Sequence, residues 1–300
     1  MEYFLELFSS GMVRGSIYAL IALGYTMVYG IIQLINFAHG EIYMIGAFVA
    51  LIVSGVLTIY GFSGVSILIL AAVIAMIYAA AYGYTLEKIA YRPLRNAPRL
   101  SPLISAIGMS LFLQNYVLLA QTPDFLPFPE LIPEFEFMEP IAHVMGSAEL
   151  IILVTSAVTM IGLTLLIKFT RVGKAMRATQ QDMTMARLVG VNVDQVISMT
   201  FIIGSVLAAI GGVLVASYIG QINFYIGFMA GVKAFTAAVL GGIGNIPGAA
   251  LGGIVLGLAE SFAAGYVSSA YEDVFAFGVL VFILILRPSG LLGKAVKQKV

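Results

Sequence analysis

Three uninterrupted apolar runs constrain this chain more than any other feature of its sequence. Residues 15–35, 63–86 and 196–217 each lack a charged side chain. Each run exceeds the roughly 18 residues that mark a membrane-spanning helix. Of all 300 residues, 61% are hydrophobic and 10% are charged, whereas a soluble domain carries about a quarter charged residues. So little charge cannot cover a surface in water. The sequence therefore predicts an all-α fold, a polytopic transmembrane helix bundle that forms a single domain over residues 1–300.

The basic residues show which ends of these helices face the cytoplasm. All lysines and arginines except Arg14 and Lys233 lie in residues 87–101, in residues 168–195 or in the tail from Arg287 onward. Basic loops stay in the cytoplasm during insertion, so we expect all three segments on the cytoplasmic side of the membrane. The net charge is zero, so no overall field attracts nucleic acid, and membrane lipid is the expected surrounding.

Residues 122–146 have the opposite character. This segment contains five acidic residues and five prolines but no lysine or arginine. The prolines prevent a continuous helix, and the missing basic residues predict an external loop.

These loop positions set the number of crossings. An even number of spans must separate two cytoplasmic segments, and an odd number before residue 87 places the N-terminus outside. Nine spans satisfy both conditions, and Gly/Pro-interrupted segments that re-enter without crossing would make the number eight or ten. The predicted spans are residues 12–35, 42–60, 63–86, 102–121, 147–167, 196–217, 228–243, 248–265 and 273–286.

Small residues recur at spacings of four and predict close contact between helices. The rows are Gly204, Ala208 and Gly212; Gly244, Gly248 and Gly252; and Gly253 with Gly257.

Polar and flexible residues interrupt the apolar pattern at residues 36–41 and 241–248. Interrupted helices in corresponding positions of two halves often mark the substrate pathway of a transporter. Both lie near the predicted cytoplasmic side, which favours a gate over a central binding site. The alternative is that both are short turns between spans. The candidate pathway or gate residues are Asn36, His39, Glu41, Gly244, Asn245 and Gly248.

Four ionisable residues stand alone in apolar surroundings. Arg14 and Lys233 have long stems, so we expect their charges to reach a membrane interface. Glu41 and Glu260 are shorter and are better candidates for buried polar pairs.

Motifs of enzymes are absent from the sequence. It has no phosphate-binding Gly-x-x-x-x-Gly-Lys-Ser/Thr loop and no His-Glu-x-x-His zinc motif, and the Gly-x-Ser-Gly match at residues 61–64 is too short to indicate a protease. We therefore expect no catalytic residue, no metal site and no cofactor bound by this chain.

The segment 168–195 contains a candidate contact with another protein. Residues 175–189 contain neither proline nor glycine, which predicts one helix, and Gly190 then fits the position that ends it. Methionines and arginines together on such a helix suit docking onto a partner protein. An amphipathic connector at the membrane surface is the alternative.

Several motifs in order along the chain resemble one family. They are GSIYAL at 15–20, NFAHGE at 36–41, GKAMRA at 173–178, ARLVGVN at 186–192, GVKAF at 231–235 and RPSGL at 287–291. With these motifs the chain, from about residue 10 to 292, is similar to the inner-membrane permease subunit of bacterial branched-chain amino-acid ABC importers.

The resemblance implies a set of partners. These are a second homologous permease, two ABC ATPase subunits that use ATP and Mg, and an external solute-binding protein. The substrate implied is a neutral, branched-chain amino acid, with related amides or urea as alternatives. The cytoplasmic segment then resembles a coupling helix that docks on an ATPase, through Arg177, Asp182, Thr184, Ala186, Arg187 and Gly190. Family members commonly have Asp-Pro-Glu-Ala-Ala-Arg where this chain has Asp-Met-Thr-Met-Ala-Arg at 182–187.

A function of another class remains open from the residues alone. A stand-alone secondary transporter or channel for a small polar solute would use His39, Glu41 and Glu260 for coupling and would need no partner subunit.

Overall fold

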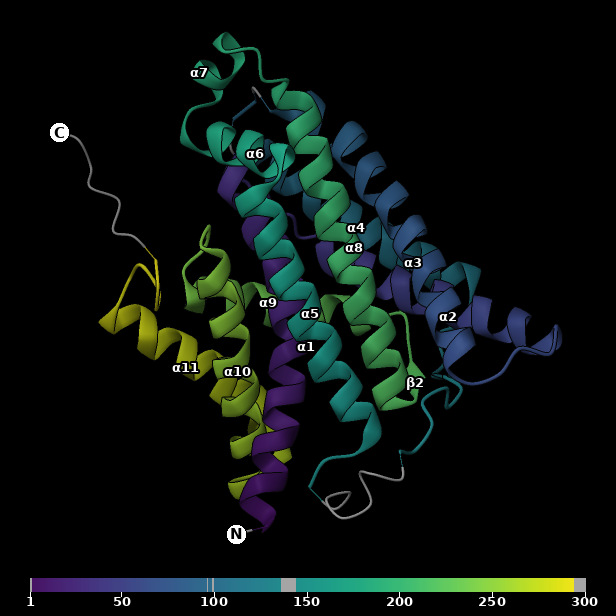
Figure 1. Ribbon diagram of the computed structural model, residues 1–300. Helices are drawn as coiled ribbons and strands as arrows, with labels where there is room; N and C mark the ends of the chain where they lie inside the picture. The colour runs from purple at the N-terminus through teal and green to yellow at the C-terminus, as the bar shows by residue number, and fades with distance from the viewer. Residues whose placement is uncertain (1, 96, 99, 136–143, 294–300) are drawn as a thin grey trace.

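The computed structural model describes residues 2–95, 97–98, 100–135 and 144–293 (Figure 1). Helices dominate this part of the chain, and two short strands are the exception, so the predicted all-α class is confirmed. The α-helices are α1 Glu2–Ile32, α2 His39–Ile59, α3 Val65–Leu86, α4 Leu100–Ala120, α5 Ser147–Phe169, α6 Arg171–Gln181, α7 Met183–Leu188, α8 Val193–Ile219, α9 Ile226–Gly241, α10 Ile246–Tyr266 and α11 Glu272–Leu286. The π-helical turn η1 Glu87–Tyr91 and the 3-10 turn η2 Arg92–Leu94 extend α3, and the 3-10 turn η4 Ser269–Tyr271 precedes α11.

Every predicted span corresponds to a helix. Within the described residues, eight helical segments are long and apolar enough to cross a membrane: Glu2–Ile32, His39–Ile59, Val65–Leu94, Leu100–Ala120, Ser147–Phe169, Val193–Ile219, Ile246–Tyr266 and Ser269–Leu286. The ninth, α9, has 16 residues, which rise about 24 Å. That is less than the roughly 30 Å of a bilayer core. The nine predicted spans are thus eight long helices and one short helix.

Helix α1 forms the centre of the bundle. It packs against α10, α8, α9 and α5, and 78% of its most apolar window is buried, compared with 6% for the segment that contains α11. A helix that is apolar all round and buried all round belongs at the core of such a bundle. The peripheral helices instead expose large apolar side chains such as Ile285 of α11 and Leu119 of α4, as a lipid-facing surface requires.

Glycine allows the central helices to touch through their backbones. A Cβ atom at Gly15 of α1 would lie 2.7 Å from the Cα of Ile254 in α10, and one at Gly253 would lie 2.6 Å from the Cα of Ala19. Such separations leave no room for a side chain, so the predicted close packing at Gly253 is confirmed. Gly257 likewise packs against Gly15.

The prediction that Gly244 belongs to a packed row is wrong. Gly244 lies outside the helices with φ +90°, and a Cβ atom there would meet no described atom closer than 3.9 Å. Since α10 begins at Ile246, the regular spacing does not continue to residue 244. Glycine is needed here for its left-handed backbone rather than for its size.

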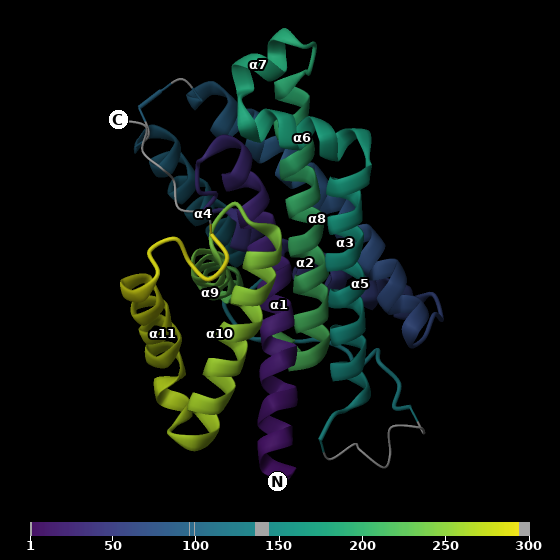
Figure 2. The ribbon, with the colours of Figure 1, turned by 60° about the vertical axis from the view of Figure 1, so that its left-hand side comes forward.

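The segments predicted to be cytoplasmic and external lie at the two ends of the bundle. Figure 1 shows α6 and α7 at one end and the N-terminus, with the strand β2, at the other, and Figure 2 shows the same arrangement after a rotation. The strand β1 Leu126–Pro127 pairs antiparallel with β2 Gln221–Ile222, which ties the predicted external loop to the end of α8. The predicted cytoplasmic and external segments therefore lie at opposite ends. Some of their charges, at Arg99, Glu136, Glu139, Lys294, Lys297 and Lys299, are outside the described residues.

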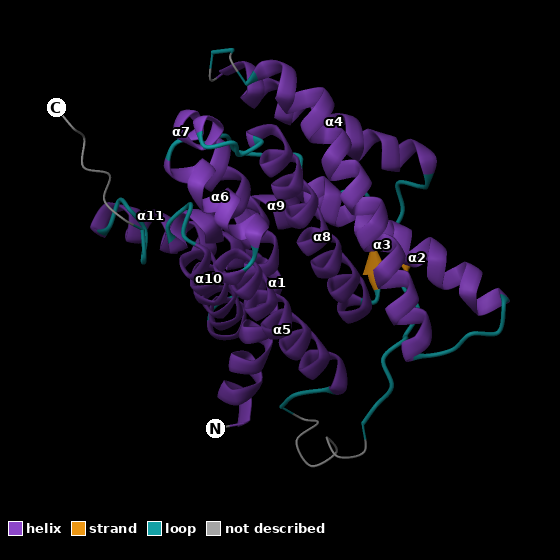
Figure 3. Cartoon of the chain, turned by 45° about the horizontal axis from the view of Figure 1, so that its top comes forward, coloured by secondary structure: helices purple, strands orange, loops and turns teal. Residues whose placement is uncertain are grey.

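The flanks of the bundle are formed by different helices. With the end that carries α6 and α7 tilted forward, Figure 3 shows α11 on one flank and α2 and α3 on the other. The helices α1, α8 and α9 lie between them.

Candidate functional site

The predicted coupling segment folds as two helices rather than one. Asp182 adopts an extended backbone, with φ −159° and ψ 111°, between α6 and α7. Its Oδ1 accepts hydrogen bonds from the backbone N–H groups of Thr184, at 2.7 Å, and Met185, at 2.9 Å. An aspartate that caps the next helix competes with the continuation of the preceding one. The prediction of one helix over 175–189 is therefore wrong at Asp182.

The ends of this segment are set by side chains and by one glycine. Thr170 Oγ1 accepts the N–H of Gly173 at 3.1 Å and starts α6. Gly190 has φ +86°, and its N–H donates to the carbonyl of Arg187 at 3.0 Å. This is the left-handed conformation of a residue that ends a helix, so the prediction for Gly190 is confirmed.

The predicted coupling residues occupy different environments. Asp182, Thr184, Arg187 and Gly190 are exposed on the segment that projects farthest from the bundle (Figure 2). Ala186 is buried beneath them.

Arg177 is also exposed, but its guanidinium turns back toward the end of α5. Its guanidinium donates to the backbone carbonyl of Ile167 at the end of α5, so it ties α6 to a membrane helix.

Sequence reasoning missed an apolar surface on the same projection. Met185, Leu188 and Val189 are large apolar side chains on a polar segment outside the bundle. They are nevertheless 60%, 75% and 77% exposed. A cluster of this kind at the end of a polar segment is typical of a protein-binding surface. The signal in the sequence was three large apolar residues within five positions of an otherwise polar segment.

The first interruption turns the chain back into the bundle. Residues 33–38 separate α1 from α2, and His39 starts α2 with its ring against Gly24 of α1. The ring centroids of His39 and Tyr25 are 4.9 Å apart. Asn36, His39 and Glu41 are all buried, so this segment is an internal turn rather than a surface loop.

Glu41 forms the buried polar pair that its short side chain predicted. Ser110 Oγ of α4 donates to Glu41 Oε1 at 2.9 Å. The contact links α2 to a peripheral helix. Ser110 was missed because a single serine in an apolar helix carries no distinct sequence signal.

The second interruption lies between α9 and α10 and contacts two other segments. Asn245 starts α10 by accepting the N–H of Gly248 at 3.3 Å, and its Nδ2 donates to the carbonyl of Leu292 in the C-terminal tail at 2.6 Å. Gln180 Nε2 of α6 lies 3.5 Å from the carbonyl oxygen of Gly244. The structure therefore brings the predicted coupling segment and the second interruption together.

Both interruptions also contact α9. The ring centroids of Phe37 and Phe235 are 5.9 Å apart, and Gly40 packs against Gly231. Ile35 and Ile243, one near each interruption, surround with Phe235 of α9 a gap too small to hold a water molecule. The short helix thus joins the two candidate gate segments.

The prediction that Lys233 reaches a membrane interface is wrong. Its side chain is 10% exposed, and Nζ lies 3.2 Å from Glu260 Oε1 and 2.7 Å from Asp273 Oδ1. Tyr18 donates to the other oxygen of Glu260 at 2.7 Å. Acidic residues on α10 and α11 form ion pairs with the ammonium within the helix bundle, so its charge is balanced there without contact with the membrane interface. The prediction of a buried pair at Glu260 is confirmed.

Arg14 joins the same cluster from α1. Its Nη1 lies 3.0 Å from Glu272 Oε2 at the start of α11. Ion pairs therefore connect the four helices α1, α9, α10 and α11.

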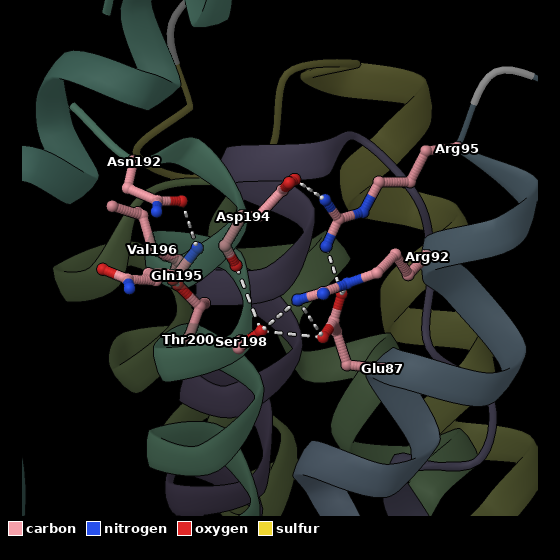
Figure 4. Close-up of polar contacts among 9 residues, drawn as sticks. All are labelled: Glu87, Arg92, Arg95, Asn192, Asp194, Gln195, Val196, Ser198 and Thr200. Atoms are coloured by element: carbon pink, nitrogen blue, oxygen red, sulfur yellow. Dashed lines mark hydrogen bonds and ion pairs between the residues drawn. The ribbon is translucent and has the colours of Figure 1, made fainter. Parts of the chain in front are cut away.

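A second ionic network, at the predicted cytoplasmic ends of α3 and α8, was missed because only the basic residues of 87–101 were considered. Glu87 is completely buried, and Figure 4 shows Arg92, Arg95 and Ser198 directed toward its carboxylate. Arg92 Nε lies 3.3 Å from Glu87 Oε1, and Ser198 Oγ donates to Oε2 at 2.8 Å. Arg95 contacts Glu87 and also Asp194, whose Oδ1 is 2.5 Å away.

Metal binding finds no support in the described part of the chain. No group of three or more histidine, aspartate or glutamate side chains there is arranged to hold a metal ion.

Comparisons with known proteins identify the family of the chain. Residues 7–284 match the family described as branched-chain amino acid transport system / permease component. The high-affinity branched-chain amino acid transport system permease protein LivH of Escherichia coli K12 is 47% identical, over 99% of this chain and 98% of its own. The corresponding protein BraD of Pseudomonas aeruginosa is 50% identical over the same shares.

A more distant relative covers part of the chain. The autoinducer 2 import system permease protein LsrC of Yersinia enterocolitica is 32% identical over 47% of this chain and 40% of its own. No solved structure matches the sequence.

Proposed function

The chain belongs to the branched-chain amino acid transport permease family, and from this premise we propose that it is the membrane subunit of an ATP-driven importer of branched-chain amino acids. It is a multi-pass protein of the inner membrane and a component of a transport system. The observation that carries the substrate class is the identity of 47% and 50% to two permeases of such systems over 99% of the chain.

The proposed assembly contains four core subunits and one external protein. A second homologous permease completes the pathway, two ABC ATPase subunits bind ATP and Mg at the cytoplasmic side, and a solute-binding protein delivers the substrate outside. In this assembly the chain itself performs no chemistry. Its role is to alternate between conformations that open the pathway to one side or the other.

The proposed contact with an ATPase subunit is α7. The exposed apolar residues Met185 and Leu188 of α7, and Val189 directly after it, lie beside Arg187. An apolar centre with arginine at its margin has the composition that protein interfaces favour. The Asp182 cap and the Gly190 turn fix α7 at both ends, so a push on α7 is transmitted as a rigid-body movement.

Two routes lead from this contact into the membrane. Gln180 of α6 reaches Gly244 in the turn between α9 and α10, and the chain after Gly190 runs directly into α8. When the ATPase dimer closes, a shift of α6 and α7 would therefore move α8 and the second interruption together. Such rocking of packed helices opens a pathway alternately to each side.

The proposal is tested by reconstitution. The permease pair, the ATPases and the binding protein from the same source are placed in proteoliposomes, and uptake of radiolabelled leucine is measured. We expect uptake only with internal ATP and with the binding protein outside, and competition by isoleucine and valine. Competition by small amides or urea instead would assign the alternative substrates.

The stand-alone transporter predicts a different result in the same experiment. In that case this chain alone would accumulate solute in response to a proton or sodium gradient. Uptake without ATP or partner subunits would refute the proposed function.

A further inference from the structure

We propose that Glu87 and Tyr91, at the predicted cytoplasmic end of α3, are positioning residues that transmit movement of residues 182–192 of the coupling segment to the gate segment 36–41. The inference rests on the proposed function and adds a specific route to it.

The route begins where the coupling segment becomes α8. Asn192 starts α8 by accepting the N–H of Gln195 at 3.1 Å. Asp194, in the first turn, lies 2.5 Å from Arg95, and Ser198, one turn later, donates to Glu87 at 2.8 Å. Figure 4 shows Asp194 and Ser198 on the side of α8 that faces the end of α3. Any shift of the first turn of α8 therefore acts on Glu87.

The centre of the route is a buried carboxylate with three partners. Glu87 is completely buried and accepts hydrogen bonds from Arg92, Arg95 and Ser198. Hydrogen bonds between charged groups have strict geometry and are costly to leave unmade when buried. The network must consequently move as a unit or exchange partners, and it cannot stretch gradually.

A wide helical turn connects Glu87 to the interior. Residues Glu87–Tyr91 form a π-helical turn, η1, at the end of α3. Single π-helical turns inside helices are frequent at functional sites. At the end of this turn Tyr91 is fully buried, with its ring centroid 5.1 Å from that of Phe201 in α8. The turn thus places one end of the network at the ionic cluster and the other inside the bundle.

The route ends at the gate segment. Tyr91 Oη donates to Asn36 Oδ1 at 2.9 Å, between two fully buried residues. The backbone carbonyl of Asn36 accepts the N–H of His39 at 3.0 Å and closes the turn that starts α2. Tyr91 therefore holds the residue that fixes the position of His39 against Gly24.

Removal of the Tyr91 hydroxyl distinguishes transmission through its hydrogen bond from transmission through the packing of α8 on His39. Helix α8 also touches His39 directly, because a Cβ at Gly204 would lie 3.5 Å from His39 Cε1. If packing alone transmitted the movement, removal of one hydroxyl would have no effect on coupling. If the hydrogen bond transmits it, Tyr91→Phe uncouples the gate while the ring still packs on Phe201.

The experiment uses the complete reconstituted complex with a reporter at the gate. Leu34→Cys, half-buried beside the turn, is the single thiol of this chain, which has no native cysteine. Its rate of reaction with a maleimide is measured with and without ATP and the loaded binding protein. Uptake and ATP hydrolysis are measured on the same samples. Tyr91→Phe is compared with Tyr218→Phe, whose hydroxyl donates to Glu149 at 3.2 Å in a different part of the bundle.

We expect ATP to change the labelling rate in the parent and in Tyr218→Phe, and to change it far less in Tyr91→Phe. Uptake per ATP hydrolysed should fall roughly fivefold in Tyr91→Phe, the factor that one neutral hydrogen bond supports, while complex yield stays normal. Ser198→Ala should act in the same direction. Its control, Ser217→Ala, removes a hydroxyl that bonds to its own helix at Val213.

Three outcomes would overturn the route. They are an ATP-dependent labelling change in Tyr91→Phe equal to that of the parent, an equal loss in both tyrosine variants, or no labelling change in a parent complex that transports. A parent that shows no ATP-dependent uptake at all would instead refute the proposed function.

Discussion

Lys233 Nζ in α9 lies 3.2 Å from Glu260 Oε1 in α10, and both side chains are almost completely enclosed. The same ammonium contacts Asp273 and Glu272 on α11. One lysine therefore balances acids from two helices, and the contact is asymmetric. Loss of the lysine leaves the buried carboxylate of Glu260 without a cation, whereas loss of the Glu260 charge leaves the lysine with two acidic partners.

This asymmetry predicts an order of stabilities. Lys233→Met should destabilise the detergent-purified chain by about 3–5 kcal/mol, the cost of breaking a buried ion pair. Glu260→Gln keeps a hydrogen-bonding group toward Tyr18 and Lys233 and should cost about 1 kcal/mol. The chain has no tryptophan, so thermal unfolding of both variants is followed by circular dichroism rather than by tryptophan fluorescence. The reverse order would mean that α11 does not hold Lys233.

The backbone contact between α9 and α10 predicts a size limit at Gly248. A Cβ there would collide with the carbonyl of Gly241, so Gly248→Leu should lower stability by about 1–3 kcal/mol, the usual cost of overpacking. Gly108→Leu is the matched control, because a Cβ at Gly108 would meet no described atom within 4 Å. Complex yield and melting temperature are the measurements. Equal behaviour of the two variants would refute the packed glycine face.

The orientation of the bundle is tested with single cysteines in a chain that has none. Glu134→Cys lies in the predicted external loop, and Arg95→Cys and Thr184→Cys lie at the opposite, predicted cytoplasmic end. A membrane-impermeant thiol reagent should label Glu134→Cys in intact cells and the other two only after lysis. Labelling in the reverse pattern would invert the topology.

Most of the bundle could be predicted because its signals are local. Apolar runs of sufficient length mark the spans, and the distribution of lysine and arginine marks the ends. Gly190 was recognisable as a helix end because its position after the polar helix is a short-range pattern. The break at Asp182 also has a local cause, the capping of α7, but the pattern of residues 175–189 equally allows one continuous helix.

The ionic networks could not be predicted in the same way. The acidic partners of Lys233 lie 27, 39 and 40 positions later in the chain. Whether a lysine reaches an interface or a carboxylate depends on which helices are neighbours. Glu87 illustrates the same point: within its own segment it is one acid among several basic residues, and its burial follows from the packing of α3 on α8. A single sequence does not specify helix neighbours.

Arg187 is predicted to act in energy coupling rather than in folding. It is exposed on α7, so Arg187→Glu should leave the yield of the complex unchanged. Uptake should fall at least about tenfold, within the range of coupling free energies between sites. Basal ATP hydrolysis should persist without stimulation by the loaded binding protein. Uptake at the parent level would exclude Arg187 from the contact.

Gly190→Pro is also expected to uncouple leucine transport from ATP hydrolysis, but for a different reason. The φ of +86° at Gly190 is inaccessible to proline, whose ring fixes φ near −65°. The substitution should therefore reorient α7 relative to α8. The ratio of leucine transported to ATP hydrolysed measures the effect, and an unchanged ratio would show that the angle of α7 is unimportant.

The most direct test of the account is a cross-link between α7 and an ATPase subunit. Thr184→Cys is exposed at the start of α7, and it would be combined with single cysteines across the ATPase surface that faces the membrane, in a complex that transports leucine. The account predicts a disulfide at one such position, with a yield that changes when ATP binds. A complex that transports leucine while Thr184→Cys reacts freely with soluble reagents and cross-links to no ATPase position would contradict it.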